Sequence, residues 1–254
     1  MKKNILLLFL IVAIGFSFFT CKNDTINHDN DDQGISLVCL GDSLTAGYGA
    51  STPGEDDESK SFPAFLQAKV KIPVINAGVS GDTTAQGLSR VDKDVLAKDP
   101  GIIIILLGAN DVFNLISPST TKANLQSIID KVDNGKRKIY LAKFYTEDVA
   151  RQLFSNYGIT NYDFQTTMIN RNDEMFSSLA SENNVTLIED IWQGVWGEHM
   201  SDEVHPDAAG YKIMADNIFN VLKPYLQANG LLKNYRMLSS LYPGRIGFRF
   251  PLVS

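Results

Sequence analysis

Five short apolar, β-rich segments recur along the chain, separated by longer segments of mixed polarity. They are Leu37–Leu40, Val74–Ala77, Ile102–Leu107, Ile139–Phe144 and Thr186–Glu189. The segment Ile102–Leu107 has no polar position, which is typical of a strand covered on both faces in a parallel sheet. Pro100 and Gly101 precede it and Gly108 follows it, so it is too short for a core helix. The pattern predicts five buried strands.

Segments of helical length lie between these strands. They are Phe62–Val70, Ala85–Ala97, Ser119–Val132, a stretch around Phe164–Glu182, and Asp207–Leu226. In the last one, apolar residues between Tyr211 and Tyr225 recur every three or four positions and form one stripe. Pro206 and Asp207 suit its first turn. The alternation predicts an α/β fold, in which a parallel sheet carries helices on both faces through right-handed crossovers.

Two segments do not follow this alternation. We interpret Tyr145–Asn161 as a lid or an irregular insertion before the fourth long helix. Residues 230–254 form a C-terminal tail whose role is left open. The folded domain is therefore predicted to span residues 35–229.

Size, charge and cysteine content narrow the class of protein. A chain of 254 residues is long enough for one larger domain with its own core. The net charge of -6, without Lys/Arg-rich blocks, argues against nucleic acid as a partner. The two cysteines, Cys21 and Cys39, define no disulfide framework, and Cys39 is expected to be a buried thiol. No His pair or Cys/His cluster has metal-ligand spacing, so we expect no metal and no cofactor.

The N-terminal segment is expected to be a targeting signal rather than part of the fold. Within residues 1–20, Lys2 and Lys3 precede an apolar stretch that is too short for an ordinary membrane span. The stretch ends at Cys21 and resembles a bacterial lipoprotein signal, in which Cys21 receives the lipid. Ordinary secretion and a retained membrane anchor are the alternatives. Residues 21–34 are polar and acidic, which predicts a flexible tether between the bacterial cell envelope and an exported domain.

A serine follows the first predicted strand directly, in the sequence Gly41-Asp42-Ser43-Leu44. Ligands bind at the carboxyl ends of strands in open α/β sheets, so Ser43 stands at a candidate site. Serine is a weak nucleophile by itself and needs a base within hydrogen-bond reach. We expect Asp42 to shape this turn through local hydrogen bonds.

His205 is the best candidate for that base among the three histidines. It stands three residues after Asp202, so one carboxylate can accept the Nδ1–H and direct Nε2 outward. Pro206 disfavours helical torsions at His205 and places it on the loop before the last helix. His28 falls in the tether, and His199 lacks this arrangement. The set predicts a serine hydrolase; the alternative is that His205 only precedes a helix.

Acyl transfer also needs hydrogen-bond donors aimed at the developing oxyanion. The segment Asn76–Thr84 follows the second strand and contains glycine, whose backbone N–H can approach a substrate closely. The segment Gly108–Asp111 follows the third strand, and the Asn110 amide can donate without carrying charge. Each segment alone is ordinary turn or helix-start sequence. Their order, each at the end of a predicted strand, is what indicates a site.

Together these blocks resemble the GDSL, or SGNH, hydrolase family over residues 35–226. The matching blocks are Gly41–Gly49, Asn76–Thr84, Leu107–Asp111 and Asp202–His205. They look most like the thioesterase, lysophospholipase and arylesterase branch. The resemblance implies a flavodoxin-like three-layer α/β/α sandwich with a five-stranded parallel sheet.

The resemblance also implies a role for each site residue. Ser43 would be the nucleophile and, through its own N–H, one oxyanion donor. Gly81 would supply a second backbone donor, and the Asn110 side chain the third. His205 would be the base and Asp202 its orienting carboxylate.

The sequence departs from the family at two positions. Glu203 follows Asp202 where glycine is frequent, and Ala109 replaces another frequent glycine. Thr45 stands two residues after Ser43, so the Gly-x-Ser-x-Gly elbow of ordinary α/β-hydrolases is absent.

These observations predict a serine esterase that hydrolyses carboxylic esters, with thioesters and lysophospholipids as candidate substrates, through an acyl-enzyme. The expected partners are a small-molecule or lipid ester and, through Cys21, the bacterial membrane. The alternatives are a carbohydrate O-acetylesterase, a noncatalytic surface lipoprotein and a flavodoxin-type phosphate-binding module. Aromatic residues before the catalytic loop and around the unclear segment line an acyl or aryl pocket or pack in the core: Phe144, Tyr145, Phe154, Tyr157, Trp192 and Trp196.

Overall fold

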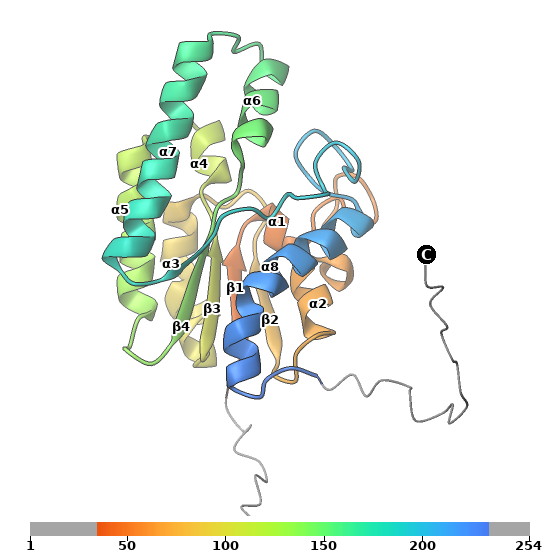
Figure 1. Ribbon diagram of the computed structural model, residues 1–254, viewed down its shortest axis with the longest axis vertical. Helices are drawn as coiled ribbons and strands as arrows, with labels where there is room; N and C mark the ends of the chain where they lie inside the picture. The colour runs from red at the N-terminus through yellow and green to blue at the C-terminus, as the bar shows by residue number, and fades with distance from the viewer. Residues whose placement is uncertain (1–34, 234–254) are drawn as a thin grey trace, which may run out of the picture. The chain divides into compact units, whose positions relative to one another are not determined.

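The domain is built on one parallel sheet, seen in the computed structural model, which describes residues 35–233 (Figure 1). The strand order is β2-β1-β3-β4-β5. The strands are β1 (Leu37–Gly41), β2 (Val74–Gly78), β3 (Ile102–Leu106), β4 (Lys138–Ala142) and β5 (Thr186–Ile188). All five predicted strands are confirmed, with ends shifted by one or two residues. Every residue of β1 and β3 is buried, as their continuous apolar sequence predicts.

The register brings the carboxyl ends of the central strands to one level. Gly41, at the end of β1, pairs with Gly78 of β2 on one side and Leu106 of β3 on the other. The loops that follow these three strands carry Ser43, Gly81 and Asn110, so all three begin at the same edge of the sheet. This edge is where open α/β sheets bind ligands.

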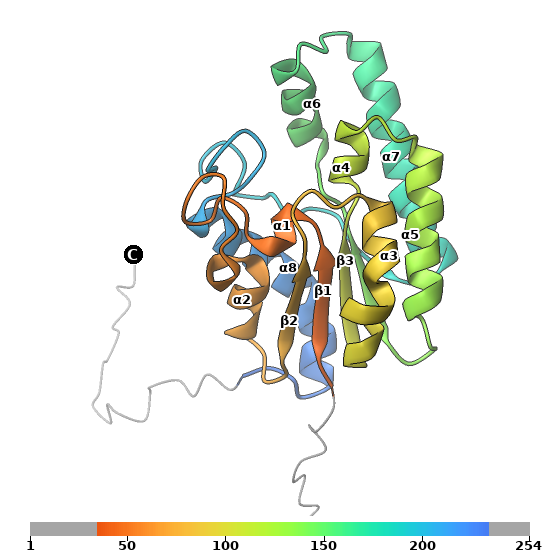
Figure 2. The ribbon, with the colours of Figure 1, turned by 180° about the vertical axis from the view of Figure 1, so that it is seen from behind.

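Helices cover both faces of the sheet. Helix α2 (Phe62–Gln67) packs against α8 (Ala208–Ala228) on one face, and α3 (Thr84–Asp94) packs against α5 (Pro118–Val132) on the other (Figures 1 and 2). Helix α7 (Tyr162–Glu182) packs against α5. The predicted three-layer α/β/α sandwich is confirmed. Short helical turns at Ser43–Ala46 (α1), Glu58–Lys60 (η1), Leu96–Lys98 (η2) and Ala109–Phe113 (α4) were not predicted.

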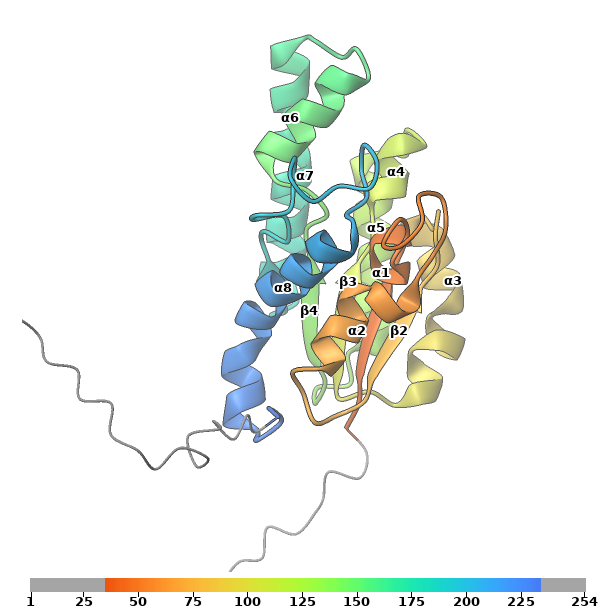
Figure 3. The ribbon, with the colours of Figure 1, turned by 90° about the vertical axis from the view of Figure 1, so that its right-hand side faces the viewer.

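The segment Tyr145–Asn161 is not irregular, which corrects the sequence interpretation. Thr146 caps helix α6 (Glu147–Asn156), and this helix packs against α7. Val149 is fully buried, and Ala150, Leu153 and Phe154 pack against the core beside it, so α6 presents a short apolar stripe that the sequence analysis did not use. Figure 3 shows α6 and the start of α7 extending past the carboxyl edge of the sheet.

The structure extends a few residues past the predicted C-terminal limit of the domain at residue 229. Residues 231–233 pair with residues 69–71, through Lys71 N–H to Leu231 O at 2.9 Å and Lys233 N–H to Lys69 O at 3.0 Å. The predicted signal, the lipidation site Cys21, the tether and the tail after residue 233 lie outside the described residues. Within residues 35–233, no helix has the length and apolar character needed to span a membrane.

Candidate active site

The candidate nucleophile stands on a tight turn between β1 and α1. Ser43 is the first residue of α1, and Asp42 caps this helix because its Oδ1 accepts the Leu44 N–H at 3.1 Å. Gly47, with φ of 89°, ends the helix after one turn. The expected role of Asp42 in shaping the turn is thus seen in its hydrogen bond. Leu44 and the rest of α1 are buried, whereas Ser43 is half-buried.

Three side chains from the two ends of the domain form a hydrogen-bonded relay. Ser43 Oγ lies 3.0 Å from His205 Nε2, although the two residues are 162 positions apart. His205 Nδ1 lies 2.8 Å from Oδ2 and 3.0 Å from Oδ1 of Asp202. The structure therefore brings together the three residues that the sequence selected, in the order that a hydroxyl, a base and an orienting carboxylate require.

Asp202 is fixed by its own loop. Its Oδ1 accepts the N–H of Val204 at 2.8 Å and of His205 at 2.7 Å. Partial burial raises the pKa of Asp202, but these backbone hydrogen bonds and the imidazole outweigh burial, so its pKa lies below the usual range. The carboxylate therefore stays ionised at neutral pH and favours Nδ1–H as the donor.

A ring that sequence reasoning missed packs on the imidazole. The Tyr48 ring centroid lies 4.5 Å from that of His205, with the planes 48° apart. The Tyr211 hydroxyl donates to Tyr48 O at 2.8 Å, so α8 holds the backbone at Tyr48. Tyr48 stands in the matched Gly41–Gly49 block, but an isolated tyrosine gives no signal that it contacts a histidine far along the chain.

The three candidate oxyanion donors lie on neighbouring loops. Gly81 has φ of 86°, and a Cβ built there meets no atom within 4 Å, so its backbone faces open space. Asn110 is the second residue of α4, and its Nδ2 donates to Asp82 O at 3.0 Å. An amide has two N–H groups, so one remains for a ligand. The Gly81 loop is joined to β1 by the Val79 N–H, which donates to Gly41 O at 3.1 Å.

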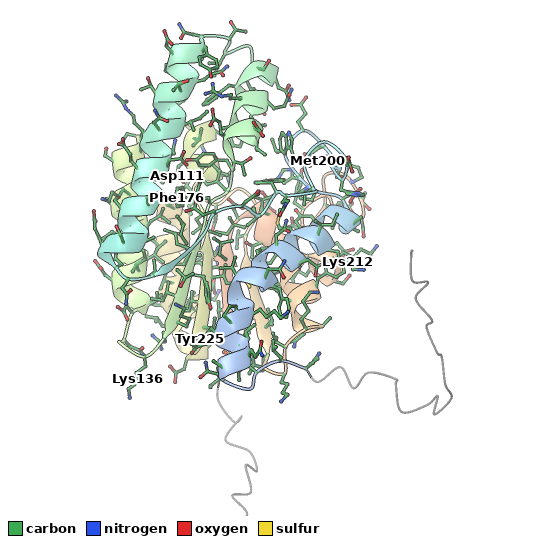
Figure 4. All side chains as sticks on the ribbon, in the orientation of Figure 1. Asp111, Lys136, Phe176, Met200, Lys212 and Tyr225 are labelled. Atoms are coloured by element: carbon green, nitrogen blue, oxygen red, sulfur yellow. The ribbon has the colours of Figure 1, made fainter. Side chains whose placement is uncertain are left out.

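Asp111 anchors α4 against α3. Its buried carboxylate accepts the Thr84 N–H at 2.8 Å and the Thr121 hydroxyl at 3.1 Å, and also bonds the Thr84 hydroxyl. Figure 4 labels Asp111 and Met200 toward the same end of the sheet. Sequence reasoning treated Asp111 only as part of a turn, because its partners come from two other helices.

Asp42 is a second carboxyl group beside the nucleophile. Burial raises its pKa to about 7, against the lowering effect of the Leu44 N–H, and the charges of Asp82 and Asp111 raise it further. Its Oδ2 has no hydrogen-bond partner among the described residues. This carboxyl therefore changes charge close to neutral pH.

The other residues that the sequence analysis singled out lie in the core or apart from the relay. Phe144, Tyr145 and Trp192 belong to the core cluster or pack against it, and Trp192 Nε1 donates to Phe144 O at 2.9 Å. His199 Nδ1 lies 3.9 Å from Asp207 Oδ2, apart from the relay. No group of three or more His, Cys, Asp or Glu side chains within residues 35–233 is placed to hold a metal ion. Cys39 is buried, as predicted.

Comparison with known proteins agrees with this geometry. The GDSL-like Lipase/Acylhydrolase family matches residues 39–213. The chain is 28% identical to Esterase TesA of Pseudomonas aeruginosa over 199 residues, covering 75% of this chain and 89% of that protein. It is 30% identical to Thioesterase 1/protease 1/lysophospholipase L1 of Escherichia coli K12 over 198 residues, covering 74% and 84%.

Solved structures give the same assignment. The crystal structure of TesA matches with a TM-score of 0.60 and 27% identity, covering 74% of this chain and 98% of that one. The resemblance found in the sequence blocks is thus confirmed at the level of family and fold. The chain belongs to the GDSL-like lipase/acylhydrolase family and is a serine-dependent carboxylic ester hydrolase.

Proposed function

We propose that Ser43, His205 and Asp202 are the catalytic triad of this esterase and that the reaction passes through an acyl-enzyme. The relay of 3.0 Å from Ser43 Oγ to His205 Nε2 and 2.8 Å from His205 Nδ1 to Asp202 Oδ2 is the observation that supports this proposal. Both separations are within the reach of proton transfer through a hydrogen bond.

In the first half of the reaction, Ser43 Oγ attacks the ester carbonyl carbon while His205 Nε2 takes the hydroxyl proton. Asp202 holds the imidazole and stabilises its positive charge. The tetrahedral intermediate collapses when the bond to the alcohol or thiol breaks, and Nε2–H protonates that leaving group. The acyl group then remains on Ser43.

In the second half, water replaces the leaving group. His205 Nε2 takes a proton from water, and the resulting hydroxide oxygen attacks the acyl carbon. The bond to Ser43 Oγ breaks, Oγ recovers its proton from the imidazole, and the carboxylic acid leaves. In both halves the Ser43 N–H, the Gly81 N–H and the Asn110 amide stabilise the oxyanion.

Exposed apolar side chains at the end of the domain that carries the site favour esters with an apolar acyl group. Among the described residues, the large exposed apolar side chains, except Ile35, lie on the Gly81 loop or around α4, the end of α6 and the start of α7. We call this set the apolar rim: Val79, Phe113, Leu115, Tyr157, Ile159, Tyr162 and Phe164. Figures 1 and 2 show α4 and α6 at the same end of the sheet as α1. Exposed apolar side chains at the end of the domain that carries the catalytic residues suit thioesters and lysophospholipids.

Replacement of the nucleophile tests the triad. Ser43→Ala is expected to abolish both hydrolysis of a short p-nitrophenyl ester and labelling by a fluorophosphonate, with an unchanged melting temperature. Ser89→Ala is the control, because Ser89 is an exposed serine of α3 that bonds only within its own helix, to Gln86 O at 2.6 Å. Full activity of Ser43→Ala would refute the proposed site.

A panel of esters tests the substrate class. Acyl chains of increasing length, a thioester and a lysophospholipid are compared with an acetylated sugar at equal concentration. Preference for longer acyl groups supports the apolar rim as a binding surface. Preference for the acetylated sugar would instead favour the carbohydrate O-acetylesterase alternative.

We also propose that the enzyme is exported and anchored to the bacterial envelope by a lipid on Cys21. The proposal rests on the basic start, the apolar stretch and the polar tether of the sequence. Labelling of cells with a radioactive fatty acid should mark the wild-type protein and not Cys21→Ser. Equal labelling of both proteins would exclude this anchor.

A further inference from the structure

One arginine of α3 reaches the ends of two strands and the loop beside them. Arg90 Nη2 donates to Gly41 O at 2.8 Å, and Nη1 donates to Ala77 O at 2.8 Å. Its Nε donates to Asp82 Oδ2 at 2.6 Å, and Nη1 also bonds Asp94 Oδ2 at 3.1 Å. The planar guanidinium thus joins the backbone of β1 and β2 to the Asp82 side chain, which a fork of five donors permits and a single ammonium does not.

Two of these contacts, at Gly41 and Asp82, lie close in the chain to proposed oxyanion donors. Gly41 stands two residues before Ser43, and Asp82 follows Gly81 directly. The backbone O of Asp82 accepts the Asn110 amide at 3.0 Å, so the third donor is connected to the guanidinium through the same residue. Gly81 itself has no side chain, and its surroundings are open, so its position depends on its neighbours.

We propose that Arg90 is the positioning residue of the oxyanion hole: it holds the Ser43, Gly81 and Asn110 donors at the spacing that the tetrahedral intermediate requires. The inference rests on the proposed function, in which those three groups stabilise the oxyanion. Arg90 touches neither substrate nor reacting atoms, and it acts through Gly41 and Asp82. A small displacement of aligned groups lowers the rate strongly without abolishing binding.

The chain offers a matched control in Arg137. Its Nε donates to Pro100 O at 3.0 Å, Nη1 to Val132 O at 3.1 Å and Nη2 to Asp99 Oδ1 at 2.7 Å. The side chain is 11% exposed, against 14% for Arg90. Lys136, its neighbour in the chain, lies at the opposite end of the sheet from Asp111 in Figure 4. Arg137 therefore makes the same kind of hydrogen bonds as Arg90, but to segments that carry no proposed oxyanion donor.

The experiment compares Arg90→Lys with Arg137→Lys. For Arg90→Lys we expect kcat for a short p-nitrophenyl ester to fall about 10- to 100-fold, because one donor of an oxyanion hole contributes on the order of 10²–10³. KM should change by less than about threefold, since the ground-state carbonyl depends little on these donors. The shape of the pH–rate profile should not change, because His205 and Asp202 are untouched. Arg137→Lys should keep the wild-type kcat even where its melting temperature falls.

A transition-state analogue separates positioning from folding. In the complex with a trifluoromethyl ketone, Ser43 Oγ adds to the carbonyl carbon of the inhibitor. The ketone oxygen becomes an oxyanion and lies among the same donors. Its Ki should rise in Arg90→Lys by the factor that kcat/KM falls, while Ki for the carboxylic acid product stays unchanged. Millimolar guanidinium should restore part of kcat to Arg90→Ala but not to Ser43→Ala. If Arg90→Lys does not fold, Asp82→Asn gives the same comparison with Arg90 in place.

The outcomes separate the two proposals. Wild-type kcat and Ki in a folded Arg90→Lys, beside an inactive Ser43→Ala, would overturn the positioning role and leave the proposed function standing. Equal losses in Arg90→Lys and Arg137→Lys that follow the folded fraction would also overturn it. An active Ser43→Ala would remove the proposed function and this inference with it.

Discussion

The ring of Tyr48 packs against the imidazole of His205, with centroids 4.5 Å apart. Tyr48 follows the nucleophile helix α1, and His205 precedes α8, so the contact joins the two ends of the fold. The contact restricts the orientation of the imidazole in addition to the Asp202 carboxylate. An aromatic contact of this kind contributes about 0.5–1.5 kcal/mol beyond area burial.

Tyr48→Ala should lower kcat/KM about tenfold, because the imidazole gains orientations that do not face Ser43 Oγ. Tyr48→Phe should keep most of the activity, since it retains the ring. Steady-state kinetics on a soluble ester measures both. Wild-type kinetics for Tyr48→Ala would mean that the relay orients His205 without this ring.

Asp202→Asn should lower kcat by roughly 10³–10⁴-fold while the protein stays folded. The amide keeps an Oδ1 acceptor for the Val204 and His205 N–H groups but no longer stabilises the imidazolium. The loss should be smaller than that of Ser43→Ala. Asp207→Asn is the control, because Asn caps a helix as well as Asp does. An Asp202→Asn enzyme within tenfold of wild type would contradict the assignment.

Asn110→Ala should reduce kcat by about 10²–10³-fold, or about 2.7–4 kcal/mol, with little change in KM. The backbone of α4 stays anchored by Asp111 and its partners in α3 and α5. Asn114→Ala, at the exposed C-terminal end of the same helix, should leave kcat unchanged. Equal effects of the two substitutions would indicate a role for α4 in stability instead of oxyanion binding.

The raised pKa of the buried Asp42 carboxyl should make the stability of the protein depend on pH. Burial raises its folded-state pKa to about 7 from the ordinary 3.8, so the folded protein holds a proton that the unfolded chain releases. The free energy of unfolding should therefore fall as pH rises from about 4 to 7 and level off above that range. The full shift corresponds to roughly 4 kcal/mol, an upper bound, because one pKa unit is worth about 1.4 kcal/mol.

Asp42→Asn should remove this decline and stabilise the protein at pH 8, since the amide keeps the cap and carries no charge. Urea denaturation at pH 5 and pH 8 measures the difference. Asp57 is a control of opposite sign: hydrogen bonds from Ser51 and Ser59 lower its pKa, so its contribution is lost as pH falls. Identical pH dependence of wild type and Asp42→Asn would exclude this titration.

Leu115 is both strained and exposed. Its φ of 55° lies in the left-handed region that a leucine rarely adopts, and its side chain is 92% exposed. Neither property favours folding, and strain of this kind gathers at functional sites. Since Leu115 stands five residues after Asn110, the expected function is contact with the acyl group of the substrate.

Leu115→Asn should lower kcat/KM for a long-chain ester about 3- to 10-fold, the factor that follows from ~1 kcal/mol of lost apolar contact. Activity on an acetyl ester should not change, and stability should be equal or higher, because Asn tolerates this φ. Ile35→Asn, another exposed apolar position, is the control. Equal loss on both esters would show that the change acts on the machinery and not on chain recognition.

Sequence reasoning found the parts of the site that local rules determine. A carboxylate three residues before a histidine, with proline after it, defines the Asp202–His205 pair without knowledge of the fold. The strand Ile102–Leu107 identifies the parallel sheet, which in turn places Ser43, Gly81 and Asn110 at one edge. Spacing and strand ends indicated the segments, whereas the choice of Gly81 and the role of each donor came from the family resemblance.

The remaining features depend on contacts between distant segments. Arg90 is four residues before Asp94, which in a sequence reads as an ordinary helix ion pair, but its guanidinium also bonds Gly41 O, 49 positions away. Helix α6 was missed although its apolar residues Val149, Leu153 and Phe154 recur at helical spacing, since the segment is short. The long reach of the Arg90 side chain to another element leaves no periodic pattern in the sequence.

The separation of 162 positions between Ser43 and His205 has a consequence for biosynthesis. During synthesis from the N-terminus, Ser43 has no base until the last fifth of the domain has emerged and α8 packs beside α2. Hydrolysis therefore begins only after residue 205 has been synthesised and has docked beside Ser43.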